Sequence, residues 1–195
     1  MASLATALRR HGLFLWLLGL LTWGVAPASW AQDVHAVPAL NARVVDQVGL
    51  LAAEERAALE RKLADFEAQA GPQIVLLLVA STQPEDITSY AQRVADAWKI
   101  GRRQVGDGVL LVVARDDRKL RIEVAKALEG AVPDLAARQI ISQAISPAFK
   151  RGDYAGGLNA GVDGLIARVR GEGLPAPEPA PPARSAGSGA DGFDW

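Results

Sequence analysis

The stretch GVLLVVARDDRKLRIEVAKALEG, residues 108–130, holds two strand-like runs separated by a charged turn. Residues 108–114 are apolar throughout, which is typical of a strand covered on both faces of a sheet. Residues 119–125 alternate between apolar and charged side chains, which predicts an antiparallel strand nearer the sheet edge. The turn at 116–119 consists of four charged residues, and it is the best candidate for chemistry in this chain.

The segments on either side of this stretch predict alternating helices and strands. Residues 73–80 (QIVLLLVA) form a second run that is apolar after Gln73, with helical patterns before it at 52–70 and after it at 85–99. A strand, a helix and a strand of these lengths imply a right-handed parallel crossover. Two helices are expected at 134–150 and 153–170, and Pro147 is expected to kink or end the first. The fold class is therefore α/β: a three-layer α/β/α sandwich with a mixed sheet and an antiparallel hairpin edge strand.

The first 31 residues have the pattern of an export signal. Arg9 and Arg10 precede an apolar run from 12 to 26, and a small-x-small motif follows at 29–31. The alternative is an uncleaved N-terminal membrane anchor, but an apolar run of about 15 residues is shorter than the roughly 20 that span a bilayer. Cleavage predicts a periplasmic or secreted protein that does not span the membrane.

The other end of the chain has the composition of a disordered tail. Residues 172–195 are rich in Pro and Ala and then in Gly and Ser, a composition that cannot bury a core. The tail ends in Phe193-Asp194-Trp195, which is either a recognition element or a solvated end with no role. One folded domain is therefore expected between the two ends, over residues 37–171.

Composition excludes several kinds of active site. The chain has no cysteine, and its two histidines are His11, within the export signal, and His35. Thiol nucleophiles, cysteine-based zinc sites and core Ser-His dyads are therefore nearly excluded. Without residues 1–31 the chain has 19 basic against 22 acidic residues, so it has no basic field to attract nucleic acid. Carboxylate chemistry or binding without catalysis remains.

Three aspartates are expected at one edge of the sheet. Asp116 and Asp117 follow the strand at 108–114, and Ser81-Thr82-Gln83 follows the strand at 73–80. If residues 43–48 form a strand parallel to these, Asp46 comes to the same edge, where ligands of open α/β sheets bind. Three carboxylates with hydroxyl or carbonyl oxygens predict a site for Ca²⁺ or another divalent cation such as Mg²⁺. No organic cofactor is expected.

Each of these residues also has an ordinary structural interpretation. Asp-Asp-Arg-Lys between two strands is a common composition for a solvated hairpin turn. Asp46 is also suited to capping the helix that follows it. Arg118 is a candidate for binding a phosphate or an anionic partner, although a surface salt bridge is the commoner fate of such a residue.

The chain resembles the TPM-domain family over residues 37–171. The motifs are VVDQVGLLAAEERAALERKL at 44–63, YAQRVADAWKIG at 90–101, GDGVLLVVARDDRKLRIEV at 106–124, LEGAVPD at 128–134 and FKRGDYAGGLNAGVDGLIARV at 149–169. The resemblance implies an exported α/β/α domain, and some members of the family bind calcium or other divalent ions through clustered acidic residues. Asp107, in the Asp-Gly step that belongs to the resemblance, is a second candidate site. About seven strand residues at roughly 3.3 Å each separate it from Asp116, so one ion cannot bind both.

Two classes of function follow from these features. The first is a cation-binding accessory module that acts on an unknown envelope or membrane protein. The second is a metal-dependent phosphatase with acid phosphatase-like activity, in which an ion polarises phosphate. The first is preferred, because a phosphoryl-transfer site normally carries more positive charge than Arg118 alone.

Overall fold

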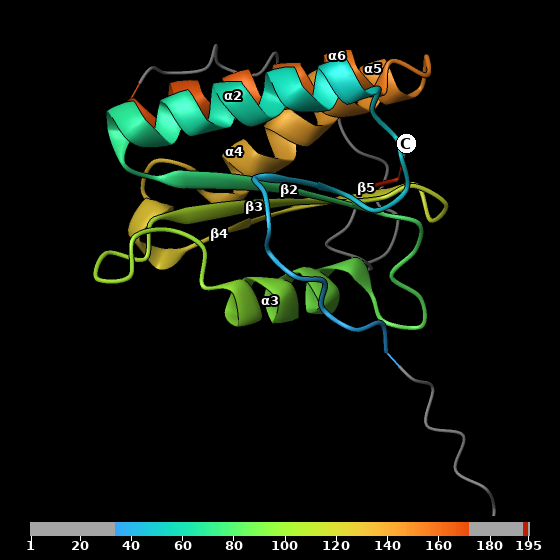
Figure 1. Ribbon diagram of the computed structural model, residues 1–195, viewed down its shortest axis with the longest axis horizontal. Helices are drawn as coiled ribbons and strands as arrows, with labels where there is room; N and C mark the ends of the chain where they lie inside the picture. The colour runs from blue at the N-terminus through green and yellow to red at the C-terminus, as the bar shows by residue number, and fades with distance from the viewer. Residues whose placement is uncertain (1–33, 172–192, 195) are drawn as a thin grey trace, which may run out of the picture. The chain divides into compact units, whose positions relative to one another are not determined.

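The computed structural model describes residues 34–171 and 193–194. The expected export signal and most of the expected tail lie outside the described residues. Figure 1 shows a central sheet with helices on both faces. Within the described ranges, no helix is both long and apolar enough to cross a membrane.

The sheet has the strand order β1-β2-β3-β4-β5 and mixed direction. Strands β1 (Val44–Asp46), β2 (Gln73–Val79) and β3 (Gly108–Ala114) run parallel. Strand β4 (Lys119–Val124) returns antiparallel to β3, and the two-residue β5 (Phe193–Asp194) pairs antiparallel with β4. The parallel crossover and the antiparallel hairpin predicted from the sequence are confirmed. Strand β1 is shorter than the expected 43–48 and lies at one edge.

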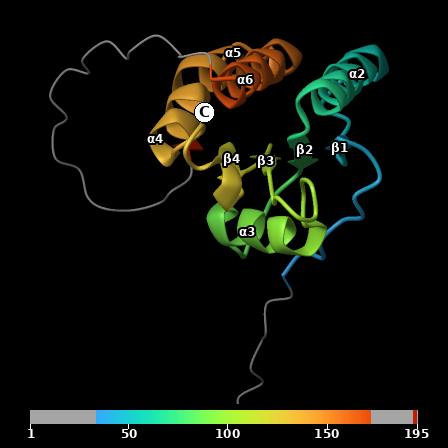
Figure 2. The ribbon, with the colours of Figure 1, turned by 90° about the vertical axis from the view of Figure 1, so that its left-hand side faces the viewer.

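The helices form two layers around this sheet. Helix α3 (Ile87–Trp98) covers one face, and α2 (Ala53–Ala70), α4 (Asp134–Gln139), α5 (Ser146–Phe149) and α6 (Tyr154–Val169) lie on the other (Figure 2). Two apolar cores result, because alternate residues of each strand point to opposite faces. In β2, for example, Leu76 packs on the side of α2 and α6, and Leu77 packs on the side of α3. This is the predicted three-layer α/β/α sandwich.

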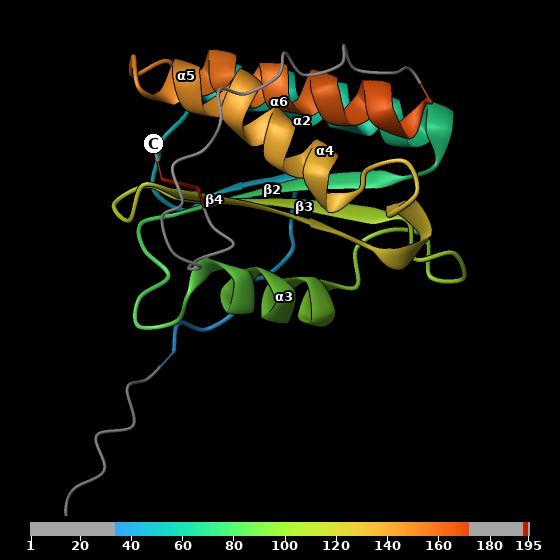
Figure 3. The ribbon, with the colours of Figure 1, turned by 180° about the vertical axis from the view of Figure 1, so that it is seen from behind.

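The helical segment expected at 134–150 is interrupted at the place where Pro147 acts. Helix α4 ends at Gln139, the wider π-helical segment η2 (Ile140–Ile145) follows, and α5 begins at Ser146 (Figure 3). Proline lacks an amide hydrogen and its ring clashes with the carbonyl four residues earlier, which explains why the regular ladder is lost here.

Candidate functional site

The carboxyl ends of β1, β2 and β3 meet at one edge of the sheet. Asp46 pairs in register with Leu78, and Leu78 pairs with Val113. The backbone pairing continues past the strands, since Asp116 donates its amide hydrogen to the Ala80 carbonyl at 2.8 Å. We call the surface formed by Asp46, Ser81–Thr82 and residues 115–118 the strand-end edge. It is the edge on which the sequence places the aspartates.

Asp46 orders the loop that leads from β1 into α2. Its carboxylate accepts hydrogen bonds from the backbone amides of Val48, Leu50 and Leu51, at 3.1, 3.1 and 3.0 Å. The N-cap of α2 is Ala52, so Asp46 holds the loop before the helix and does not cap the helix itself. Three backbone donors occupy about three of the four lone-pair positions of this carboxylate.

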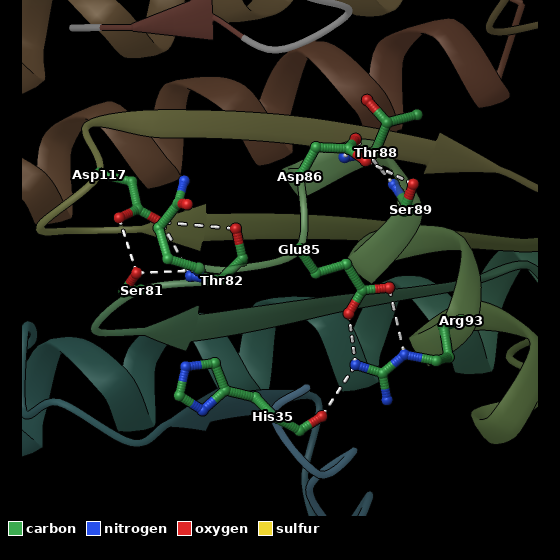
Figure 4. A network of polar contacts seen from close by, with 10 residues as sticks. His35, Ser81, Thr82, Glu85, Asp86, Thr88, Ser89, Arg93 and Asp117 are labelled. Atoms are coloured by element: carbon green, nitrogen blue, oxygen red, sulfur yellow. Dashed lines mark hydrogen bonds and ion pairs between the residues drawn. The ribbon is translucent and has the colours of Figure 1, made fainter. Parts of the chain in front are cut away.

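Asp117 joins the β3–β4 turn to the loop between β2 and α3. Its carboxylate accepts from the Ser81 hydroxyl at 2.7 Å, from the Thr82 amide at 2.8 Å and from the Thr82 hydroxyl at 3.4 Å (Figure 4). Thr82 is fully buried, so its amide depends on this partner. The hydroxyls that the sequence offers as cation ligands are therefore donors to Asp117.

Asp116, the next residue along the turn, points to a different partner. Its side chain is 55 % exposed and forms an ion pair with Arg115 at 2.7 Å. The hydrogen bond from Arg115 lowers the pKa of Asp116 below its ordinary value, with the positive charge of Arg115 acting in the same direction. Adjacent aspartates thus have different roles: Asp117 joins two loops of the scaffold, and Asp116 forms an ion pair at the surface.

Arg115 is the partner that holds Asp116. The hydrogen bond with Asp116 is the main reason why the pKa of Arg115 is raised, and the negative charge of Asp116 acts in the same direction. Arg115 was not predicted as a member of this edge, although it stands next to Asp116 in the sequence.

Arg118 lies at the tip of the turn. It is exposed and has a left-handed backbone, with φ at 55°. Within the described part of the chain, its side chain makes no hydrogen bond or ion pair. An exposed guanidinium at this position is available to an anionic group.

The possible metal ligands of the strand-end edge are all oxygen atoms, which suits a hard cation. They are not arranged as a metal site. Across residues 34–171 and 193–194, no group of three or more His, Cys, Asp or Glu side chains is placed to hold a metal ion. A cation at this edge therefore requires Asp116 to leave Arg115 and to meet the lone pairs that Asp46 and Asp117 do not already use.

Asp107 lies at the opposite end of β3 from Asp116, as the strand length predicts. It is 2 % exposed, and its carboxylate accepts from the amide of Arg102 at 2.8 Å and from Nε of Arg102 at 2.7 Å. Burial raises its pKa, but the hydrogen bonds and charge of Arg102 outweigh burial, so the pKa is below its ordinary value. Asp107 thus closes the loop before β3, with both carboxylate oxygens occupied.

Comparison with known proteins gives a family and a fold. A family model described as the TPM domain matches residues 44–168. The chain is similar to the solution NMR structure of the N-terminal domain of a protein from P. gingivalis, with 27 % identity and a TM-score of 0.61, covering 66 % of this chain and 82 % of that one. It is also similar to the NMR structure of BA42 from Bizionia argentinensis, with 26 % identity and a TM-score of 0.56, covering 63 % and 83 % of the two chains.

A third solved structure shares the fold alone. The N-terminal domain of cg2496 from Corynebacterium glutamicum has 17 % identity and a TM-score of 0.54, covering 78 % of this chain and 98 % of that one. No curated protein matches the chain.

Proposed function

This chain belongs to the TPM domain family, and we propose that it is an exported accessory module that binds a divalent cation and an envelope protein at its strand-end edge. The main observation in support of this proposal is that two adjacent aspartates have different partners. Asp117 is fixed by Ser81 and Thr82, whereas the Asp116 carboxylate is exposed beside it.

Two carboxylates held by hydrogen bonds, Asp46 and Asp117, and one that can turn, Asp116, together form a weak cation site. Asp46 and Asp117 each accept three hydrogen bonds, so each has about one lone-pair position left for a ligand. Asp116 contributes a full carboxylate once it turns away from Arg115. Because that turn breaks an existing ion pair, we expect a dissociation constant of about 1 mM, in the range of weak extracellular calcium modules.

Release of Arg115 gives the cation a way to influence partner binding. In the described structure, Arg115 is neutralised by Asp116. When Asp116 binds a cation, Arg115 loses its ion-pair partner and stands three residues before the exposed Arg118 on the same turn. Two guanidinium groups at this spacing favour an acidic segment of a partner protein.

The test is the thermal stability of the chain with and without calcium. With a dissociation constant of about 1 mM, 10 mM Ca²⁺ stabilises the folded state by about 1.4 kcal/mol, or roughly 5 °C in Tm for a domain of this size. Asp116→Asn should remove this shift while leaving the Tm without calcium nearly unchanged. Asp65→Asn, which changes an exposed aspartate on α2, is the matched control and should retain it.

The same variants separate this function from the phosphatase alternative. A wild-type chain whose Tm does not respond to 10 mM Ca²⁺ or Mg²⁺ contradicts the cation site. Calcium-dependent hydrolysis of p-nitrophenyl phosphate that is lost in Asp116→Asn but not in Asp65→Asn would instead favour the phosphatase.

A further inference from the structure

The two edges of the sheet are closed in different ways. At the β1 edge, the carboxylate of Glu60 on α2 accepts from the backbone amides of Arg43 and Val44, at 3.1 and 2.8 Å. The Val44 amide, which points away from β2 and which another strand would need, is thus occupied by a side chain. Exposed edge donors are a risk for unwanted pairing, and at this edge the protein's own helix covers one of them.

At the other edge, β4 presents a row of backbone groups. Ala125 donates its amide hydrogen to the carbonyl of Gly108 at 2.9 Å. Ladder bonds of an antiparallel pair alternate along the strand, so the odd-numbered residues of β4 bond to β3 and the even-numbered ones face outward. The backbone N–H and C=O groups of Leu120, Ile122 and Val124 therefore point away from β3.

The chain's own C-terminal segment occupies one end of this row. Strand β5 pairs Phe193 with Leu120 and Asp194 with Lys119 (Figures 1 and 3). Leu120, whose backbone groups point away from β3, lies opposite Phe193 in the position where both backbone bonds are exchanged.

The rest of the row has room for a longer strand. Among the residues that the structure describes, β5 covers two positions of the six in β4. Beside the uncovered end, on the α3 side, is a cavity of about 210 Å³ lined by Ala95, Ile100, Leu110 and Glu123 among others. A residue opposite Glu123 on an added strand would face this cavity, because alternate side chains share a face.

We propose that the outer edge of β4 is an acceptor site for an extended peptide and that the chain's own C-terminal segment closes it in cis through Phe193–Asp194. The site takes antiparallel peptides with a bulky apolar residue opposite Leu120 and an acidic residue opposite Lys119. Addition of a strand to an open sheet edge is an established mode of peptide recognition. The C-terminal segment therefore acts as an internal competitor for partners of this pattern.

The connection between α6 and β5 allows binding in cis. Twenty-one residues, 172–192, separate the last residue described after α6 from β5. The composition of these 21 residues predicts a flexible linker, for which the expected end-to-end distance is roughly 25 Å and the effective concentration of the terminus is about 1 mM. If the terminal strand binds the edge with a dissociation constant of about 100 µM, a peptide in trans should bind the intact chain about tenfold more weakly than a chain without that strand.

The experiment measures binding of a fluorescent peptide, AGSGADGFDW, corresponding to residues 186–195. Fluorescence anisotropy is recorded in EDTA, so the result is independent of the cation site proposed above. The chain that ends at Gly192 should bind the peptide, and the full chain should bind it about tenfold more weakly. Equal binding by the two chains, or absence of binding by the chain that ends at Gly192, overturns the proposal.

Two backbone-methylated peptides test the register. Methylation of the Phe193 amide blocks the group that faces Leu120 and should abolish binding. Methylation of the Asp194 amide, which faces away from β4, should leave binding within about twofold. Equal loss with both peptides contradicts strand addition, and a concentration-dependent dimer of the full chain shows exchange between copies and contradicts closure in cis.

Discussion

Replacement of Asp117 by alanine should destabilise the chain far more than the same change at its neighbour Asp116. Asp117 accepts two short hydrogen bonds, from the Ser81 hydroxyl and the Thr82 amide, and a longer one of 3.4 Å from the Thr82 hydroxyl. Bonds to a charged acceptor contribute about 1.5–3 kcal/mol each. The Ser81 hydroxyl can turn to water, whereas Thr82 is fully buried, so the Thr82 amide accounts for most of the loss.

We expect Asp117→Ala to lower the free energy of unfolding by about 3 kcal/mol, because a buried amide then lacks a partner. For a domain of about 135 residues this corresponds to roughly 10 °C in Tm. Urea unfolding followed by circular dichroism at 25 °C measures the loss, and thermal melts provide a second estimate. Asp117→Asn should fall between alanine and wild type, since the amide oxygen retains one neutral hydrogen bond.

Asp116→Ala is the matched control, because it removes a carboxylate one residue away whose partner is an exposed ion pair. Exposed pairs contribute little to stability, so its unfolding midpoint should stay close to wild type. If Asp117→Ala and Asp116→Ala had equal midpoints, the assignment of one aspartate to the scaffold and the other to the ligand surface would be refuted.

Two further predictions concern the opposite end of β3. Asp107→Asn should destabilise the chain by about 2 kcal/mol at pH 7, since the buried carboxylate loses its charged hydrogen bonds to Arg102. Because the pKa of Asp107 is lowered in the folded state, the difference in stability from wild type should shrink as the pH falls below about 4. A difference that does not change between pH 7 and pH 3 would argue against this ion pair. Gly108→Ala should lower the free energy of unfolding in urea by about 2–3 kcal/mol, because a Cβ there would lie 2.6 Å from the carbonyl carbon of Ile100. Gly130→Ala is the control and should be neutral, because a Cβ there meets nothing within 4 Å. Equal stabilities of the two variants would contradict the close packing of Gly108 against Ile100.

The long elements of the fold were predictable because their patterns are strong. Strand β3 is buried at every position, as a continuous apolar run of this length predicts for a sheet covered on both faces. Strands β1 and β5 have three and two residues, which is too short for periodicity to define. Their pairing depends on tertiary partners, such as the Glu60 carboxylate at β1.

The location of the candidate site was predictable, but the role of each side chain in it was not. Strand order alone brings Asp46, Asp116 and Asp117 to one edge. Whether a carboxylate is free or engaged depends on the path of the loops around it. The Thr82 amide points at Asp117 and the Leu50 amide points at Asp46, and neither sequence pattern contains that information. As a result, two of the three aspartates predicted as ligands also accept hydrogen bonds from backbone amides.

A calcium titration of the ¹⁵N-labelled chain, followed by amide NMR, tests the cation site most directly. We expect saturable shifts at millimolar Ca²⁺ that are confined to the strand-end edge and its adjoining loops, at residues 46–51, 81–83 and 115–118. These shifts should be lost in Asp116→Asn and retained in Asp65→Asn. Shifts centred instead on the loop at 101–107, or amide resonances that do not move at 10 mM Ca²⁺, would contradict a cation site built around Asp116.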